Sequence, residues 1–528
     1  MNGKEWVTNR WLIGLLVAAL GLPCAFAGAA DDSPAAAGEE LGEEPGEKHG
    51  PEMSPGARLL GDPRHPDPPP EGSFTPDPRY DDEPYDAEAQ LAIYSGKHLN
   101  RTARPPISLG RRLYDRGAYE PRPTWLGAKN PINFHLMAYG DLRVAGAYYD
   151  NGVVAADGES EQSVIATRLN LDIDMALTAT ERIHAFVRPL DKNGSFTRYQ
   201  ISGGEVEDEF VDEFDFDLDT LFFEGDLGAI SQGLTGNTNS IDLPIALGRV
   251  PLFTQNGIWL DDAFDGVAMG ITAKNSPALD ISNYDLTFFA GLNEVSTAAV
   301  PGSDDAAKVF GLAGFADARE GYVEFGYGYV DADDGDLSYH NLTAAFTRRY
   351  AGRLANSVRL IGNFGQSATI KTADGLAVLV ENSLVPRRPI NAIPSPINFV
   401  PYFNFFAGFD SPQPLARAAG TGGLLKNIGI NFESDGLTGY PTLDDRANES
   451  YGGALGLEYL FKLNRQIVIE GAFVERMGGS VLGSEVALGA RYQHRITNAW
   501  IVRLDAMHGW RQGLDDVFGL RLELRRKL

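Results

Sequence analysis

Cysteine is almost absent from this chain of 528 residues, whose single cysteine is Cys24. Residues 1–27 read as a secretory signal peptide: Lys4 and Arg10 precede a short apolar run, and Ala25-Phe26-Ala27 supplies the small residues of a cleavage site. Cleavage removes Cys24, so the mature chain has neither thiol nor disulfide and suits an oxidising compartment.

Long hydrophobic runs are also lacking. After the signal peptide, no apolar stretch is long enough to cross a bilayer as a helix, which excludes a helical inner-membrane protein. The formal net charge is −27, and Lys and Arg are not clustered. Phosphate contacts need clustered basic residues, so nucleic acid is excluded as a partner.

Motifs of catalysis and metal binding are missing as well. The chain contains neither Gly-x-Ser-x-Gly nor His-Glu-x-x-His, and its eight histidines are scattered. The sequence therefore predicts no enzyme, no cofactor and no bound metal. An outer-membrane hydrolase is the weakest of the alternatives.

What the chain does contain begins with an acidic, proline-rich segment. Residues 31–90 hold 12 prolines and 17 Asp or Glu against 4 Lys or Arg. Such a composition cannot bury enough apolar surface to offset chain entropy. We therefore predict a disordered periplasmic extension over residues 28–99, available to a periplasmic partner, and a linker over residues 100–132.

From residue 133 to residue 528, the main signal is a repeated alternation of apolar and polar residues. Between Thr167 and Leu190 one parity is apolar, and it comprises Leu169, Leu171, Ile173, Met175 and Leu177. The opposite parity is polar and comprises Arg168, Asn170, Asp172 and Asp174. Segments of about ten residues with this period are typical of transmembrane β-strands. The alternation also appears in residues 214–219, 322–329, 485–492 and 500–506.

The turns between these segments fall into two classes, as in outer-membrane barrels. The short turns are residues 178–181, 462–465 and 495–498. The long loops are residues 150–161, 191–212, 293–307 and 385–448. The sequence thus predicts an all-β, antiparallel transmembrane barrel in the bacterial outer membrane, in contact with lipid and lipopolysaccharide.

The C-terminal residues 518–525 alternate in the same way and predict the closing strand. Because an even number of strands is expected, we predict about 18, with 16 as the alternative. The uncertain strand is Lys426–Glu433, "KNIGINFE".

Three short motifs carry a family resemblance: Phe223-Glu224-Gly225-Asp226-Leu227-Gly228, then Leu247-Gly248-Arg249, then Phe264-Asp265-Gly266-Val267. In this order they resemble the alginate-export family of outer-membrane porins. The resemblance covers roughly fifty residues directly. It implies an 18-stranded monomeric barrel that moves an anionic polysaccharide or a small anion.

The candidate pore-lining residues carry both signs of charge, whereas a conduit for a polyuronate should be lined by Arg and Lys. They are Arg143, Arg168, Asp172, Asp174, Asp215, Asp217, Asp219, Arg249, Arg387, Arg388 and Arg417. Paired opposite charges that stiffen the wall are the competing interpretation of this set. Arg249 is expected to face the lumen, because charge facing lipid at mid-membrane is costly.

The long loop 385–448 is rich in proline and aromatic residues, and a loop of this length usually has a function. We expect it to fold into the barrel as a constriction, with a lid on the rim as the alternative. The predicted function is passive transport, as a porin or export channel, of a hydrophilic solute: a carbohydrate, a carboxylated polysaccharide or a small anion. The alternative is a structural or surface-anchoring barrel with a plugged lumen.

Overall fold

The computed structural model describes residues 107–109, 135–153, 160–178, 180–192, 194–203, 208–385, 397–433, 436–461, 464–477 and 483–528. The chain divides into two units, residues 1–99 and 100–528, and all described residues belong to the second. The predicted signal peptide and acidic extension lie outside the described residues, as does the linker except for β1 (Ile107–Leu109). Their assignments stay predictions.

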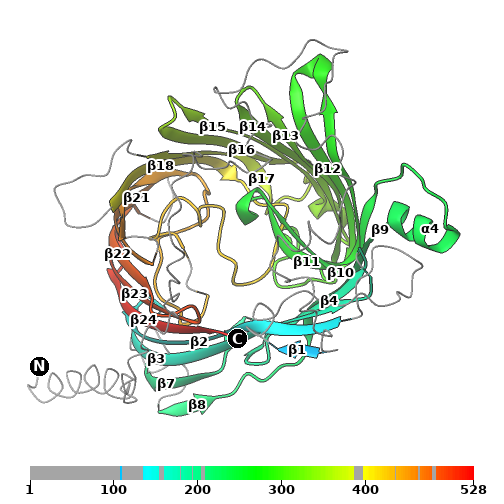
Figure 1. Ribbon diagram of the computed structural model, residues 1–528. Helices are drawn as coiled ribbons and strands as arrows, with labels where there is room; N and C mark the ends of the chain where they lie inside the picture. Colours follow the sequence, from blue (N-terminus) through cyan, green and yellow to red (C-terminus); the bar gives the residue numbers. More distant parts are fainter. Residues whose placement is uncertain are drawn as a thin grey trace, which may run out of the picture. The chain divides into compact units, whose positions relative to one another are not determined.

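The second unit is a closed antiparallel barrel of 18 strands, which confirms the predicted fold (Figure 1). Pairing of β2 with β24, from Asp141 opposite Lys527 to Asp150 opposite Phe518, closes the ring. In chain order the barrel strands are β2 (His135–Asp150), β3 (Glu161–Ala176), β4 (Arg182–Val187), β9 (Leu218–Asp226), β10 (Pro244–Thr254), β11 (Leu260–Ser276), β12 (Ile281–Asn293), β13 (Ala307–Ala318), β14 (Gly321–Ala332), β15 (Tyr339–Tyr350), β16 (Leu354–Phe364), β17 (Asp374–Leu384), β18 (Ile397–Ser411), β20 (Ser450–Phe461), β21 (Arg465–Arg476), β22 (Glu485–Arg495), β23 (Trp500–Arg511) and β24 (Val517–Lys527).

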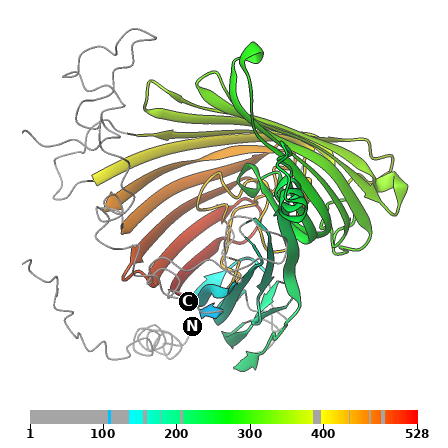
Figure 2. The same cartoon turned by 45° about the vertical axis from the view of Figure 1, so that its right-hand side comes forward.

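The strands are tilted and twisted, and their connections differ between the two ends of the barrel (Figure 2). At one end, here called the short-turn end, residues 319–320, 351–353 and 496–499 join neighbouring strands directly. This end also carries α4 (Leu227–Thr235), whose first turn is capped because Ala229 donates its backbone N–H to the Asp226 carboxylate at 2.6 Å. The opposite end, the long-loop end, carries most of the longer connections, which confirms the predicted asymmetry.

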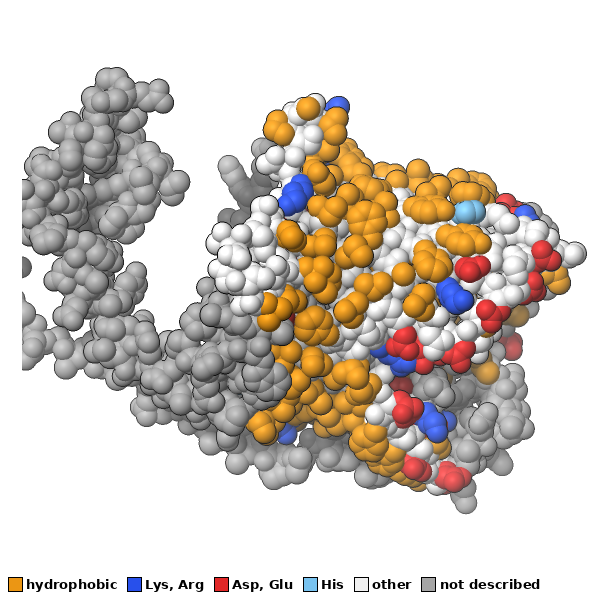
Figure 3. Space-filling model, turned by 90° about the vertical axis from the view of Figure 1, so that its right-hand side faces the viewer, with side chains coloured by type: hydrophobic (Ala, Val, Ile, Leu, Met, Phe, Trp, Pro, Cys, Tyr) orange, Lys and Arg blue, Asp and Glu red, His pale blue; other side chains and the backbone are white. Residues whose placement is uncertain are grey.

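The alternation of side chains matches the two faces of the barrel wall. On β22, Val486 and Leu488 are exposed on the outer face, whereas Glu485, Ala487 and Gly489 are buried on the inner face. Large exposed side chains on other strands have the same outward parity, among them Leu247, Met269, Phe288, Phe310, Phe325, Leu342, Leu360, Phe405, Leu455 and Ile469. Figure 3 shows such hydrophobic side chains spread over one outer face, with charged groups gathered towards its edge.

Pairing of the first and last strands closes the seam of the barrel, and an apolar outer face requires lipid around it. The protein is therefore built as a bacterial outer-membrane β-barrel. No helix among the described residues is long and apolar enough to cross a bilayer.

The lipid-facing assignment predicts the effect of one charge. Leu455 on β20 is 67% exposed on the outer face. We expect Leu455→Arg to destabilise the barrel by about 2–4 kcal/mol, because the guanidinium loses water inside the bilayer. Urea unfolding in lipid vesicles measures this. Leu514→Arg is the control, since Leu514 is 46% exposed in the connection between β23 and β24, and it should change stability by less than about 0.5 kcal/mol. Equal effects at both positions would contradict the assignment.

One part of the barrel wall is interrupted. β4 pairs with β3 and ends at Val187. The chain then forms a small hairpin of β5 (Asp191–Lys192) and β6 (Ser195–Phe196). After this hairpin, β7 (Arg198–Ser202) pairs with β3 again, further along that strand. On the neighbouring strand, β8 (Glu209–Val211) pairs with β7, and β9 pairs with β4 only from Leu218 onward. Among the described residues, 188–192 and 194–197 therefore form no strand pairing with 212–217. The predicted strand through Phe214–Asp217 is wrong for this reason.

The predicted loop 385–448 is wrong for residues 397–411, because β18 spans Ile397–Ser411 and pairs with β17 and β20. The loop proper is the connection 412–449, here called the inner loop, of which residues 434–435 are not described. Lys426–Glu433 lies in this loop and forms no strand. The predicted number of strands holds because β18 takes the place of that segment.

Candidate functional site

The inner loop lies inside the ring of strands, where it appears as the orange trace in Figure 1. Its apolar side chains Leu424, Leu425, Ile428 and Phe432 are buried in one cluster with wall residues such as Phe406. Within the loop, β19 (Ala416–Arg417) pairs with the start of β11. The expectation that this loop folds into the barrel is confirmed for residues 412–433 and 436–449.

Glycines on the inner face of the wall receive the larger loop side chains. A Cβ on Gly328 of β14 would lie 2.4 Å from Leu415, and a Cβ on Gly326 would lie 2.5 Å from Trp259. Trp259, from the connection between β10 and β11, is fully buried and donates its indole N–H to Asn341 of β15 at 2.7 Å. The wall and the loops thus fit by close approach at these two positions.

Arg417 holds the inner loop against the connection between β10 and β11. Its guanidinium donates to the carbonyl oxygens of Gly257 at 2.8 Å, Ile258 at 2.6 Å and Gly422 at 2.6 Å, and also to that of Gly423. Burial lowers the pKa of Arg417 to about 10, so it stays charged at neutral pH. The structure uses this predicted pore-lining residue to join two loop backbones.

Two neighbouring aspartates of the inner loop have opposite environments. Burial raises the pKa of Asp445, whose carboxylate accepts the backbone N–H of Gly423. At Asp444 burial acts in the same direction, but ion pairs with Arg446 at 3.0 Å and Arg476 at 2.7 Å outweigh it and lower the pKa. Asp444 therefore ties the loop to β21 as a charged group.

Across the lumen wall of β22, β23, β24 and β2 runs a row of charged side chains, here called the arginine belt: Arg143, Arg491, Arg503, Arg521, Asp505 and Glu523. Asp505 accepts from Arg491 at 2.7 Å, from Arg503 at 2.8 Å and from Arg521 at 2.9 Å. Glu523 accepts from Arg143 at 2.7 Å and also from Arg521. Four arginines and two carboxylates leave the belt with a net charge of +2.

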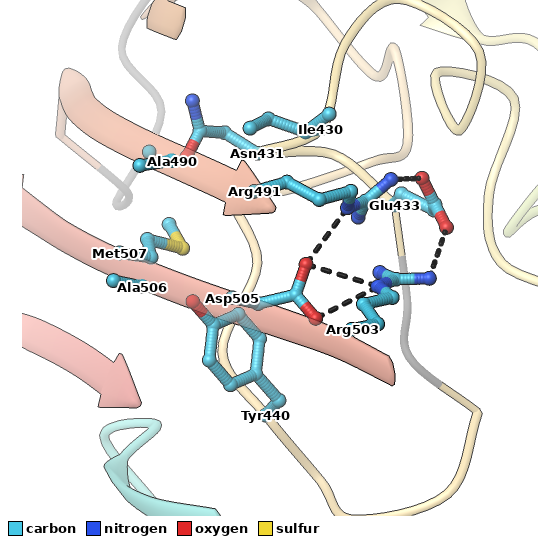
Figure 4. Close-up of a pocket in the computed structure, with 11 residues that line it drawn as sticks. Ile430, Asn431, Glu433, Tyr440, Ala490, Arg491, Arg503, Asp505, Ala506 and Met507 are labelled. Carbon is cyan, nitrogen blue, oxygen red and sulfur yellow. Dashed lines mark hydrogen bonds and ion pairs between the residues drawn. The ribbon is translucent and has the colours of Figure 1, made fainter. Parts of the chain in front are cut away.

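The belt meets the inner loop in the pocket of Figure 4. Glu433 of the loop accepts from Arg491 at 2.6 Å and from Arg503 at 3.4 Å, and Tyr440 of the loop lines the same pocket. Figure 4 shows the two guanidinium groups between Asp505 on the wall and Glu433 on the loop. This arrangement binds a carboxylate in the lumen through two arginines, which is a strong and directional form of recognition.

Of the predicted pore-lining residues, Arg143 is part of the belt. Arg168 on β3 lies 3.7 Å from Asp191 and 5.3 Å from the ring of Phe196, both on the hairpin β5–β6. Asp172 and Asp174 share the lumen-facing imidazole of His184 on β4, at 3.5 Å and 2.8 Å. These contacts, between neighbouring strands and with a loop, fit the interpretation that the charged residues stiffen the wall. A role in solute binding stays a prediction.

The remaining predicted residues are scattered. Asp219 accepts from Arg188, while Asp215 and Asp217 lie in the segment 212–217 outside the strands. Arg387 and Arg388 lie outside the described residues.

Arg249 does not face the lumen, so that prediction is wrong. It shares the parity of the exposed Leu247 and Phe253, opposite to the buried Val250. Asp265 and Glu294 neutralise it on the outer face, the former at 3.3 Å, so the cost of an unpaired charge in lipid does not apply.

Two hollows lie among the described residues, and the first of them is lined in part by the inner loop. One, of about 950 Å³, is lined by residues 296–304 and by loop residues that include Arg417 and Arg446. The other, of about 300 Å³, lies towards the short-turn end and is lined by Asn356, Arg359, Glu381 and other polar side chains. The lumen thus offers polar recesses as well as the arginine belt. Among the described residues, no group of three or more His, Cys, Asp or Glu could hold a metal ion.

The belt residues Arg491, Arg503, Arg521, Asp505 and Glu523 were not among the predicted site residues. A signal for them exists, because all five share the inward parity of consecutive strands. Glu433 carries no comparable signal.

No protein-family model matches this chain, and no curated protein sequence does either. Solved structures of similar fold include Acinetobacter baumannii OccAB4, at 10% identity and a TM-score of 0.46 over 74% of this chain and 98% of that one. Pseudomonas aeruginosa OccK5 (OpdH) is 10% identical, with a TM-score of 0.47 over the same shares. Escherichia coli Wzi, described as a carbohydrate-binding β-barrel involved in group 1 capsule assembly, is 11% identical, with a TM-score of 0.41 over 73% of this chain and 84% of that one. No statement about solute follows from likenesses this distant.

Proposed function

We propose that this protein is an outer-membrane channel for the passive passage of a hydrophilic solute that carries carboxylate groups. The observation that supports this most is the arginine belt, which holds Glu433 between Arg491 and Arg503 inside the lumen. A site that binds a carboxylate of the protein in this geometry suits a carboxylate of a solute. No chemical step is part of the proposal.

Within this class the solute is a carboxylated carbohydrate or a small organic anion. The resemblance of residues 223–267 to alginate-export porins adds an acidic polysaccharide to the class, with export as its direction. The mixed lining of the lumen, with Asp172 and Asp174 on β3 next to the belt strand β2, favours short solutes over a long polyuronate.

A second candidate function is a structural or surface-anchoring barrel with a plugged lumen. The buried apolar cluster of the inner loop favours it, since Leu424, Leu425, Ile428 and Phe432 occupy space inside the ring. Conductance in planar bilayers separates the two, because a plugged barrel passes no ions.

The test of the proposal is uptake into liposomes that contain the purified protein. Galacturonate should enter faster than galactose, which has the same ring without the carboxylate, and both should enter faster than into protein-free liposomes. Glucosamine, a cation at neutral pH, is the charge control and should enter more slowly than galacturonate. Equal rates for galacturonate and galactose would remove the carboxylate preference, and entry of neither would favour the plugged barrel.

A further inference from the structure

Glu433 is a loop residue in a position where its carboxylate touches two wall arginines. Its Oε2 lies 2.6 Å from Nη1 of Arg491, and its Oε1 lies 3.4 Å from Nη1 of Arg503. The Glu433 side chain is 38% exposed, so solvent reaches this carboxylate, whereas the side chains of Arg491 and Arg503 are 11% and 16% exposed.

The wall holds both arginines without help from Glu433. Arg491 and Arg503 each donate Nε–H to Asp505, at 2.7 Å from Arg491 and at 2.8 Å from Arg503, and the Asp505 side chain is 5% exposed. The Nη groups of both arginines are directed at Glu433 (Figure 4). The anchored arginines therefore present a binding surface, and Glu433 is the group that occupies it.

The charges also indicate that the arginines form the binding surface and that Glu433 occupies it. The arginine belt has a net charge of +2 without Glu433 and +1 with it, so removal of the loop carboxylate leaves a stronger anion site. A carboxylate tethered by its own chain acts at an effective concentration of about millimolar or above. A free carboxylate must exceed that concentration to displace it, or bind more tightly.

We infer that Glu433 is an internal competitor at a carboxylate site formed by Arg491 and Arg503, and that a solute carboxylate enters this site by displacing it. The inference rests on the proposed function, because it assigns the site at which the solute binds. Its consequence is weak and rapidly reversible binding, which suits a channel since a tightly bound solute would not leave.

Glu433→Gln tests the inference, since the amide keeps the size of the side chain and removes its charge. In planar bilayers with the full chain, sodium galacturonate should reduce the ion current, and the concentration for half-maximal reduction should fall by about tenfold in the variant. Glu294→Gln is the matched control, because Glu294 is also a loop carboxylate on a barrel arginine, Arg249, but on the outer face. It should leave the half-maximal concentration unchanged, and galactose should show no difference between the three proteins.

The double variant Glu433→Gln/Arg491→Lys locates the effect. Lysine keeps the charge but lacks the planar pair of donors, so most of the tenfold gain should disappear. A gain that persists in the double variant, or an unchanged half-maximal concentration in a folded Glu433→Gln protein, would overturn the inference. If galacturonate acts on the wild-type channel in either case, the proposed function stands. If galacturonate neither enters liposomes nor affects the current of any variant, the proposed function fails with it.

Discussion

Replacing residues 412–449 by a four-residue glycine-rich turn should raise the single-channel conductance by about threefold or more. The inner loop buries Leu415, Leu424 and Ile428 inside the barrel, and barrels of 16–18 strands without such a filling leave an aqueous channel. A short turn can join the strands because β18 and β20 pair directly, with Gly408 opposite Ser450. Planar-bilayer recording in symmetric salt measures the change.

A point variant tests the same claim without a deletion. Leu415→Asp places a charge at a fully buried anchor of the loop and should change the conductance in the same direction by a smaller factor. Ile370→Ser is the control, because Ile370 is 80% exposed in the connection between β16 and β17. An unchanged conductance in a deletion variant that still resists heat in detergent would show that the loop does not limit ion flow.

Asp505→Ala should destabilise the barrel by about 3–5 kcal/mol, since it leaves three arginines without their common carboxylate. We expect the effect to be largest at Arg521, because its side chain is fully buried and loses the ion pair with Asp505. Urea unfolding of the refolded protein in lipid vesicles measures the loss. Asp505→Asn keeps the shape of the side chain and should have a smaller effect.

Asp516→Ala is the matched control for this prediction. The Asp516 side chain is 52% exposed and lies 3.8 Å from His508, a geometry in which an ion pair contributes about 0–1 kcal/mol. A loss at Asp505 no larger than the loss at Asp516 would mean that the arginines of the belt are satisfied by water and not by the wall.

The alternation of residues predicted the barrel well where the inner face of the wall meets polar groups. On β3, for example, Arg168 and Asp174 make lumen contacts on the predicted parity. β18 escaped prediction because the inner loop covers its inner face. There Phe406 is buried inward while Phe405 and Phe409 are exposed outward, so large apolar residues occur on both parities and the period of two is weakened.

The same packing explains the false strand at residues 426–433. Ile428 and Phe432 alternate with polar neighbours, yet both are buried against the barrel wall from the loop side. An alternating segment predicts one covered face and does not say which element covers it. When a loop folds into the lumen, the alternation of apolar and polar residues is weakened in the strand behind it, and the loop itself shows that alternation.

The candidate site was predictable in part. Arg491, Arg503 and Asp505 lie on one hairpin, where Arg491 is opposite Asp505, so parity and a short turn suffice to bring them together. Glu433 reaches them from a part of the inner loop that lies outside any strand, and nothing in the spacing of residues specifies that contact. The prediction that Arg249 faces the lumen was wrong for another reason. Its two carboxylate partners, Asp265 and Glu294, allow a charge on the outer face.

The closing pair of β2 with β24 has a consequence for biogenesis. The first and last strands of the barrel must find each other, so the contact with the largest sequence separation is also the one that removes the two free edges. Until residues 517–527 are in place, any sheet that forms has residues 141–150 of β2 unpaired at one side. Assembly therefore depends on keeping the earlier strands from pairing with other chains until β24 pairs with β2.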